Sequence, residues 1–289
     1  MLNKQYELIA DAPKEIEWLK YYEKAMEEYN LLLDRNGNNE KVFQDFFEKN
    51  PSFIPGALEI FGHSGHYPYM NTLITQPKIG NIMQRIPDFL WLAQDSLSFC
   101  PVFIEIESPN KRMFTKNKVV TAEFNQAMNQ INEWRHILKN PTNLHLFYEY
   151  FDISKELMKK EFNPQFVLIY GRRIEYEEEE LLRGIRAEQR RVNVDIFSYD
   201  RLKPISDYNQ FTCTSVKDYK YTIKSIPPTF RYRADCADVL YKYKGFYDAI
   251  DNMEKTSEER KKFLKKRYKY WADFGKRGCP GVLVGMEGE

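Results

Sequence analysis

Short apolar runs alternate with amphipathic segments along the middle of the chain. Four of these runs have the length of a β-strand, at 87–93, 102–107, 165–173 and 194–199. Segments with the 3.6-residue period of a helix separate the later runs. Strands that alternate with helices at these spacings are typical of a layered sheet, so we expect an α/β fold with helices flanking the sheet.

The most regular helical pattern covers residues 119–139. Six apolar side chains fall within one arc when each residue is turned by 100°, namely Phe124, Ala127, Met128, Ile131, Trp134 and Leu138. Gln130 and Glu123 lie together at one border of this arc. We expect the apolar arc of this helix to pack against the core. Gln130 would then lie at the edge of the packed face, where its side chain could contribute to a functional site.

Two helices are predicted before the first strand and one late in the α/β region. Pro13 opens an amphipathic stretch at 14–34 that ends at an Asn/Gly cluster, and a second helix is expected at 40–49. A stretch at 175–191 carries acids in its first turns and arginines in its last turns. This charge order suits the helix macrodipole and predicts a third helix there.

The composition indicates a soluble protein that stays inside the cell. The chain of 289 residues has 43% hydrophobic and 29% charged residues, so it can bury one large core or two modest ones. Its apolar stretches are too short to span a bilayer, and its N-terminus lacks the apolar region of a signal peptide. The four cysteines lie far apart, as is usual for reduced thiols, and we expect a cytoplasmic location.

Charge is divided unevenly along the chain. From residue 201 onward there are 19 Lys and Arg against 12 Asp and Glu, whereas residues 1–200 hold 24 against 30. The last predicted helix, at 257–274, has a capping-box opening, with Thr256 and Ser257 as candidate caps and Glu259 three residues after Thr256. Its candidate nucleic-acid-binding side chains are Lys261, Lys262, Lys265, Lys266, Arg267 and Lys269. They suit salt-dependent binding to a phosphate backbone. The alternatives are a solvated helix that docks by its aromatic residues and a helix on a membrane surface, which its poorly separated aromatic and charged residues favour less.

Three carboxylates stand at the ends of two neighbouring apolar runs. Asp88 begins the run at 87–93, and Glu105 and Glu107 end the run at 102–107 on one side, because side chains alternate along a strand. If the two strands pair antiparallel, Asp88 lies beside Glu105. Close carboxylates repel one another, and a bound cation relieves the repulsion. Such ligands suit Mg²⁺, with Mn²⁺ as a substitute, and the ion activates water for phosphate ester hydrolysis.

This order of Pro-Asp, a turn and an apolar strand that ends in acids resembles the PD-(D/E)XK nuclease superfamily. Within that superfamily, the chain is most similar to the Shedu-type anti-phage defence proteins. Six short motifs of that family occur in order up to residue 202: QDFFEKNPSF, PDF, EI-x-x-P, a glutamine followed by an aromatic residue in QINEW, LIYGRR and FSYDRL.

The resemblance implies a restriction-endonuclease-like fold with a mixed sheet, Mg²⁺-dependent cleavage of DNA and assembly into a homo-oligomer. It makes Asp88 and Glu105 metal ligands. From its place on the same side of the strand we add Glu107 as a third, and we take Gln130 as a group that orients water. Lysine is usual at the position of Glu107, so the sequence departs from the family there. Lys111, four residues on, is the candidate for the missing positive charge. We expect neither a membrane nor a small organic cofactor.

The chain divides into three parts on these features. Residues 1–36 form a helical N-terminal segment, 37–204 the nuclease-like domain, and 205–289 a basic and aromatic region that we do not expect to fold independently. Glu40, near the start of the domain, is a further candidate carboxylate for the site.

Each candidate residue also has an ordinary structural explanation. Asp88 suits a strand start after proline, and Glu105 and Glu107 suit the solvated face of an edge strand. His63 and His66, in HSGH, fit a turn better than a metal site. Two other functions stay open. One is a nuclease fold that has lost turnover through Glu107 and binds nucleic acid or a partner protein as a sensor; the other is hydrolysis of RNA or a small phosphate ester.

Overall fold

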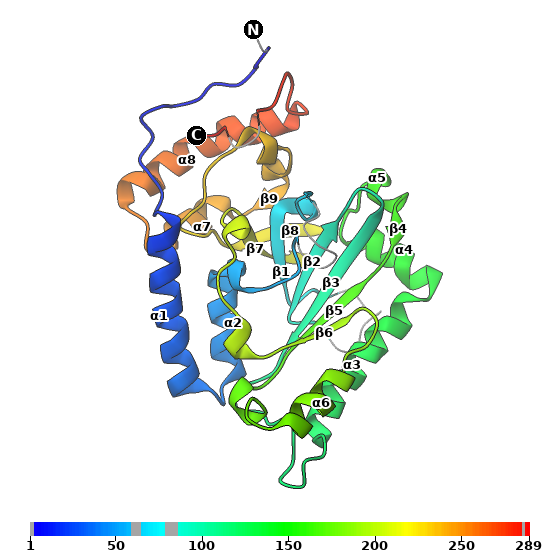
Figure 1. Cartoon of the computed structure of the whole chain (residues 1–289). Coiled ribbons are helices and arrows are strands. Elements are labelled where there is room, and N and C mark those ends of the chain that lie inside the picture. Colours follow the sequence, from blue (N-terminus) through cyan, green and yellow to red (C-terminus); the bar gives the residue numbers. More distant parts are fainter. Residues whose placement is uncertain (1–2, 59–64, 79–85, 285–286) are drawn as a thin grey trace.

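The computed structural model describes residues 3–58, 65–78, 86–284 and 287–289 (Figure 1). Within these ranges nine strands form a single mixed sheet. Its order is β6-β5-β3-β2-β1-β7-β8-β9, with β4 beside β3. This architecture confirms the expected α/β fold with a mixed sheet; His63 lies outside the described residues.

The central strands are buried on both faces. The strands are β1 Thr72–Thr75, β2 Phe89–Gln94, β3 Ser98–Ile106, β4 Glu161–Phe162, β5 Gln165–Ile169, β6 Val194–Phe197, β7 Thr212–Lys217, β8 Lys220–Ser225 and β9 Tyr243–Lys244. β2 pairs antiparallel with β1 and β3, whereas β5 and β6 run parallel to β3. Helices cover both faces of such strands, which is why their sequences lack the polar alternation of a half-solvated strand.

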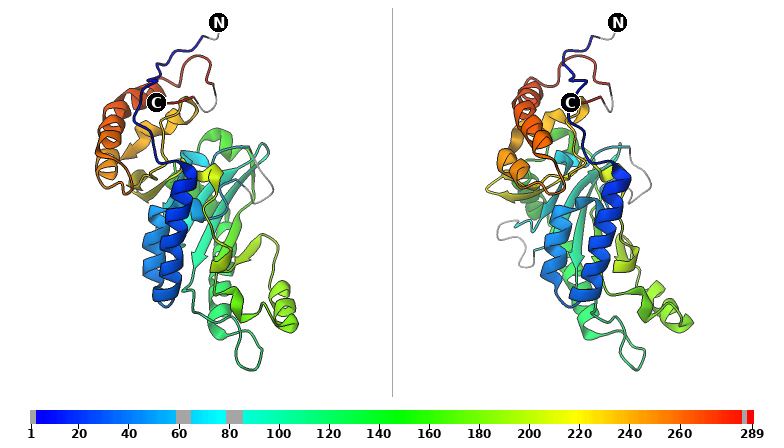
Figure 2. Two further views of the ribbon diagram at one scale, coloured as in Figure 1. Left: turned by 60° about the vertical axis from the view of Figure 1, so that its left-hand side comes forward. Right: turned by 90° about the vertical axis from the view of Figure 1, so that its left-hand side faces the viewer.

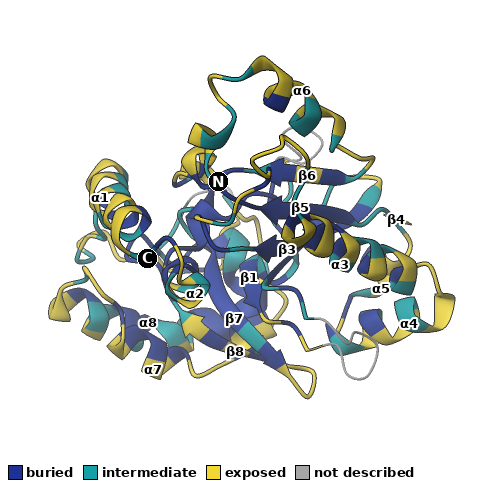
Figure 3. Cartoon of the chain, turned by 90° about the horizontal axis from the view of Figure 1, so that it is seen from below, coloured by how far each residue is buried: buried dark blue, intermediate teal, exposed yellow. Residues whose placement is uncertain are grey.

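Alternate residues of the central strands enter two separate cores. The helices are α1 Trp18–Asn36, α2 Glu40–Lys49, α3 Ala122–Leu138, α4 Pro141–Tyr150, α5 Lys155–Met158, α6 Glu180–Glu188, α7 Phe246–Asp251 and α8 Glu258–Lys276. Phe103 packs with residues of α3 and α4, and its neighbour Ile104 packs with residues of α1 and α2. Figures 2 and 3 show α1 and α2 together on one face of the sheet. No helix in the described ranges is long and apolar enough to cross a membrane.

Two helices begin later than predicted. The helix expected over 119–139 begins at Ala122, with Thr121 as its N-cap, whose side chain accepts a hydrogen bond from the Phe124 N–H at 3.3 Å. Its six predicted apolar residues are all buried, as expected. The helix predicted over 14–34 is α1, which begins only at Trp18. Residues 14–17, after Pro13, are not helical.

The helix predicted over 175–191 is also shorter in the structure. α6 begins at Glu180, and Arg173–Glu175 form a 3-10 turn before it. The Glu175 carboxylate accepts hydrogen bonds from the N–H groups of Met113 and Phe114, at 2.8 and 2.9 Å. A contact with a distant loop therefore competes with the local helical pattern.

Residues 205–289 continue the same sheet. β7 pairs parallel with β1 and antiparallel with β8, α7 packs against β8, and α8 packs against α7 (Figure 1). The N-cap of α8 is Ser257, which accepts from the Arg260 N–H at 3.2 Å. Of the two predicted cap residues the structure uses Ser257, so the predicted pairing of Thr256 with Glu259 is wrong.

Candidate active site

The antiparallel pairing of β2 and β3 brings Asp88 and Glu105 together. Phe89 lies opposite Ile104, so the next pair outward is Asp88 and Glu105. The Asp88 carboxylate accepts a hydrogen bond from the Ile106 N–H at 2.8 Å, which holds it across the end of β3. The two carboxyls therefore meet where both strands leave the buried centre of the sheet.

Glu105 is a buried carboxyl with only one paired oxygen. The residue is 9% exposed. Gln130 of α3 donates a hydrogen bond to its Oε1 at 2.6 Å, whereas its Oε2 is buried and has no hydrogen-bond partner among the described residues. A buried oxygen without a partner is costly, and an ionised carboxylate more so. This carboxyl is therefore suited to hold a proton or to face a cation.

Both central carboxyls hold their protons more tightly than usual. Burial raises the pKa of Asp88 to about 7 and that of Glu105 to about 10. Electrostatic repulsion among Asp88, Glu105 and the nearby Glu40 and Glu107 raises these pKa values further. Hydrogen bonds to each carboxyl lower its pKa, but by less than burial raises it. Without a cation, the pair retains at least one proton near neutral pH. A bound cation would favour the ionised forms.

Glu107 lies beyond the end of β3 and has different contacts. Its N–H donates to the Ile169 carbonyl at 3.0 Å, so the backbone still follows β5. Its carboxylate accepts a hydrogen bond from Lys111 Nζ and lies near the carboxyl of Glu40, at the start of α2. Burial and the nearby Glu107 charge raise the pKa of Glu40. We call the four acids, Glu40, Asp88, Glu105 and Glu107, the carboxylate cluster.

Tyr170 lies beside the cluster and Glu175 holds the loop that follows it, although sequence patterns did not single them out. Tyr170 follows β5, its hydroxyl donates to the Arg112 carbonyl at 3.3 Å, and burial raises its pKa to about 12. Glu175 holds the loop through the N–H groups of Met113 and Phe114. An aromatic residue directly after a buried strand was a usable signal for Tyr170. Glu175 offered no signal, because its partner Met113 is 62 residues away in the chain.

The donor set suits a hard divalent cation held by two carboxylates. As the side chains stand, no three His, Cys, Asp or Glu groups in the described part of the chain converge closely enough to hold an ion. Two carboxylates suffice for Mg²⁺, which keeps several waters and takes further oxygens from substrate phosphate. Asp88 and Glu105 fit this role, and the unpaired Oε2 of Glu105 is the atom that a cation would satisfy. Glu107, predicted as a third ligand, is engaged by Lys111 instead.

The basic residues of α8 do not form one continuous cationic surface. The Arg267 guanidinium is buried and donates to the carbonyls of Glu7 and Glu289, at 2.6 and 2.7 Å. Arg267 is therefore not available to nucleic acid, contrary to the prediction. Lys261 and Lys265 both contact the aspartate that ends α7. The exposed members of the predicted set are Lys262, Lys266 and Lys269.

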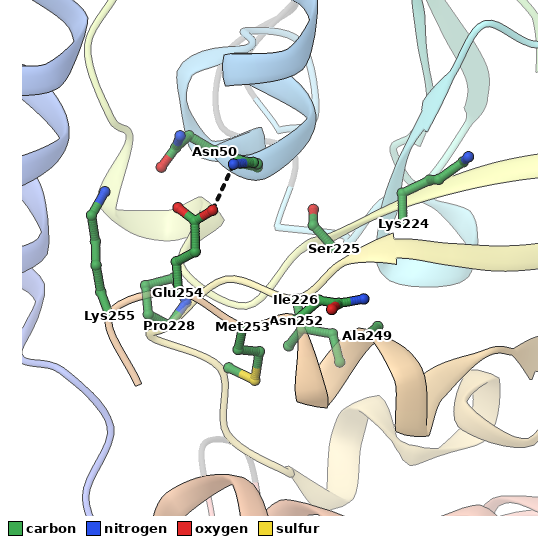
Figure 4. Close-up of a pocket in the computed structure, with 11 residues that line it drawn as sticks. Asn50, Lys224, Ser225, Ile226, Pro228, Ala249, Asn252, Met253, Glu254 and Lys255 are labelled. Atoms are coloured by element: carbon green, nitrogen blue, oxygen red, sulfur yellow. Dashed lines mark hydrogen bonds and ion pairs between the residues drawn. The ribbon is translucent and has the colours of Figure 1, made fainter. Parts of the chain in front are cut away.

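A separate hollow of about 330 Å³ lies between the C-terminal end of α2, β8 and α7 (Figure 4). Its lining includes lysines but none of the acids of the carboxylate cluster. Lys49 is paired with Glu254 at 2.6 Å, and Lys255 with Glu28 at 2.7 Å. These pairs largely neutralise the lysine charge, so the hollow adds nothing to the chemistry of the cluster.

The fold and the site define an α/β protein with a mixed sheet, in which a buried acid, Glu105, and the partly buried Asp88 meet at the ends of two central strands. The family model described as Shedu protein SduA, C-terminal, matches residues 37–202, which is more than half of the chain. The chain therefore belongs to the Shedu family, as its sequence motifs predicted, and this membership suggests a role in anti-phage defence. No curated protein matches the chain in sequence.

Proposed function

We propose that this protein is a metal-dependent DNA endonuclease that acts in anti-phage defence. Family membership supports the defence role, and the pairing of Asp88 with Glu105 supports the chemistry. The observation that carries the proposal is the buried, unpaired Oε2 of Glu105. A half-paired carboxyl pressed against a second carboxyl weakens a fold unless a cation or a proton offsets its charge, and strongly shifted pKa values are concentrated at functional sites.

The residues of the chain have distinct roles in this proposal. Mg²⁺, when bound, polarises the phosphodiester and lowers the pKa of the attacking water. Asp88 and Glu105 supply its protein oxygens, and the Ile106 N–H fixes Asp88. Gln130 binds Oε1 of Glu105 and thereby orients the carboxylate with Oε2 free. Lys111 offsets negative charge that develops on the phosphate oxygens.

The ion pair of Lys111 with Glu107 favours a second candidate function. This pair neutralises the cation that would otherwise act on substrate, and lysine is absent from position 107 itself. A protein of this kind would bind nucleic acid as a sensor without cutting it. Lys111→Gln separates the two functions, because it lowers the cutting rate of an endonuclease by about 100-fold, whereas a sensor shows no Mg²⁺-dependent cutting in any variant.

Nicking of supercoiled plasmid DNA in Mg²⁺ or Mn²⁺ tests the proposal. The parent is expected to nick, whereas Asp88→Asn and Glu105→Gln lose nicking because each removes an ionised ligand. Asp195→Asn, an exposed aspartate on β6, is the matched control and is expected to nick at the parental rate. Thermal melting of each variant checks that it is folded.

Two results would contradict the endonuclease. One is nicking by Asp88→Asn at the parental rate, which would remove the carboxylate pair from the chemistry. The other is a parent that retains plasmid DNA but does not cut it with either ion, which would favour the sensor.

A further inference from the structure

We propose that a groove beside the carboxylate cluster binds the phosphate backbone of the strand to be cut. The groove has a volume of about 500 Å³, and its lining includes Lys111, Arg112, Phe114, Lys116, Glu123 and Tyr170. We call it the basic groove. The inference rests on the proposed function, since it takes nucleic acid to be the substrate, and it identifies which surface carries that substrate.

The basic groove begins at the cluster itself. Lys111 lines the groove and also contacts the Glu107 carboxylate. Tyr170 lines it from the end of β5, and Gly171 follows with φ 63°. A Cβ at Gly171 would lie 2.9 Å from the Lys111 carbonyl oxygen, so glycine lets the loop approach the sheet closely. A strand whose scissile phosphate sits at Asp88 and Glu105 would therefore continue into the groove.

The charge of the groove is positive and partly unpaired. Three cations line it against a single acid, Glu123. Lys116 is exposed and has no ion-pair partner among the described residues. Arg112 is 66% exposed, and its only contact with an acid there is with Glu175 at 3.4 Å. These side chains can bind phosphates without first breaking strong ion pairs.

A hairpin at residues 114–120 holds the loop that carries these cations in place. Phe114 bridges Val120, and the Thr115 N–H donates to the Val119 carbonyl at 2.8 Å. Phe114 is buried, and Glu175 accepts from its N–H at 2.9 Å. The backbone of the groove is therefore ordered before substrate arrives, which reduces the entropy lost on binding.

The position of the hairpin favours the groove over α8 as the substrate surface. Figure 1 shows the hairpin below α6 at the foot of the molecule and α8 at the opposite end. The loop that carries the groove lies beside the lower end of α1, because the Asn110 N–H donates to the Gly37 carbonyl at 2.9 Å. A groove of this volume is too large for a single phosphate. We therefore assign the backbone contacts to Arg112 and Lys116 and not to the lysines of α8.

Binding of a short fluorescein-labelled DNA duplex, measured by fluorescence anisotropy over a range of salt concentrations, tests this assignment. All proteins carry Asp88→Asn, so that DNA is not cut. The groove variant is Arg112→Gln with Lys116→Glu, and the competing α8 variant is Lys262→Gln with Lys266→Glu. The control, Lys217→Gln with Lys220→Glu, makes the same charge change at the exposed turn between β7 and β8.

The groove variant is expected to bind at least tenfold more weakly than the parent and the control. Its slope of log affinity against log salt should be shallower by about two, because each lost phosphate contact removes about one unit. Both replaced side chains are exposed, so the melting temperature should stay at the parental value and exclude a folding defect.

The remaining outcomes separate this inference from the proposed function. Parental affinity in the groove variant, with loss in the α8 variant, overturns the groove and leaves the endonuclease intact. Groove-dependent binding in this assay, together with no nicking of plasmid DNA by the protein that retains Asp88, overturns the endonuclease and leaves the groove. A parent without salt-dependent duplex binding overturns both.

Discussion

At the scale of single residues, the site depends on the buried carboxyl of Glu105, whose two oxygens are unequally stabilised by the rest of the chain. Its Oε1 is bound by Gln130 and its Oε2 by no described residue, while Asp88 lies directly beside it. Hydrogen bonds from the chain satisfy one side of this carboxyl and leave the other for a ligand. Metal-free protein must therefore keep a proton there or lose stability.

The buried carboxyl of Glu105 predicts how the stability of the protein changes with pH. Burial raises the pKa of Glu105 to about 10, well above its value in the unfolded chain. The unfolded state releases the proton first as the pH rises, so the free energy of unfolding of metal-free protein falls from about pH 4 upward. Glutamine has no proton to release, so Glu105→Gln removes this fall in stability with pH. The substitution should raise the free energy of unfolding at pH 8 by on the order of 1 to 3 kcal/mol.

Urea denaturation at pH 4 and pH 8 measures the effect of Glu105→Gln. The gain should nearly vanish at pH 4, where both states of the parent are protonated. Asp195→Asn, with an exposed side chain, should show no such gain at either pH. A Glu105→Gln protein that is less stable than the parent at pH 8 would show that the ionised carboxylate is already satisfied without a metal.

At the scale of elements, the loop beside the cluster is held by one buried acid. Glu175 accepts the N–H groups of Met113 and Phe114 and has a side chain that is only 8% exposed. The glutamate belongs to a 3-10 turn before α6, so two segments far apart in the chain share one anchor. The shape of the basic groove depends on this anchor.

Glu175→Ala is predicted to loosen the loop and to destabilise the protein by about 2 kcal/mol, because two N–H groups lose their acceptor. Hydrogen exchange of amides in 111–121 should become faster. The matched control is Glu179→Ala, which removes the exposed partner of Lys118 and should cost less than about 1 kcal/mol. Unchanged exchange in the loop of Glu175→Ala would show that other contacts hold it.

Much of the fold and part of the site could be predicted because they follow from local patterns. The apolar arc of α3 and the alternation at Glu105 depend on helix and strand periods alone. The shortened α6 and the buried Arg267 could not be predicted, because each has partners far away in the chain. Glu7 and Glu289 carry the carbonyls that bind Arg267, so a residue that looks like part of a polybasic surface is internal.

At the scale of the whole molecule, the region after residue 204 is joined to the rest by polar contacts as well as by the sheet. The Tyr208 hydroxyl accepts hydrogen bonds from the N–H groups of Gly56, Ala57 and Leu58, at 3.2, 2.9 and 3.2 Å. Tyr208 is itself fully buried in the core that includes α1 and α2. The added region therefore completes a core of the preceding one.

Tyr208→Phe is predicted to lower the free energy of unfolding by on the order of 1 to 3 kcal/mol, because three buried N–H groups lose their acceptor. Unfolding should stay a single transition when it is followed both by circular dichroism and by tryptophan fluorescence. Tyr219→Phe, at a residue that is 63% exposed, should leave the midpoint unchanged. Two separate transitions in Tyr208→Phe would instead show that the regions unfold independently.

The short connection between β2 and β3 has a consequence for folding kinetics. The Asp95 carboxylate accepts from the N–H groups of Leu97 and Ser98, at 2.7 and 2.6 Å, so the hairpin can close from local contacts alone. We therefore expect the hairpin to close before α3 docks, so that Asp88 lies beside Glu105 before Gln130 can bind it. The electrostatic barrier is therefore met on the way to the native state, and alkaline conditions should slow refolding more than they speed unfolding.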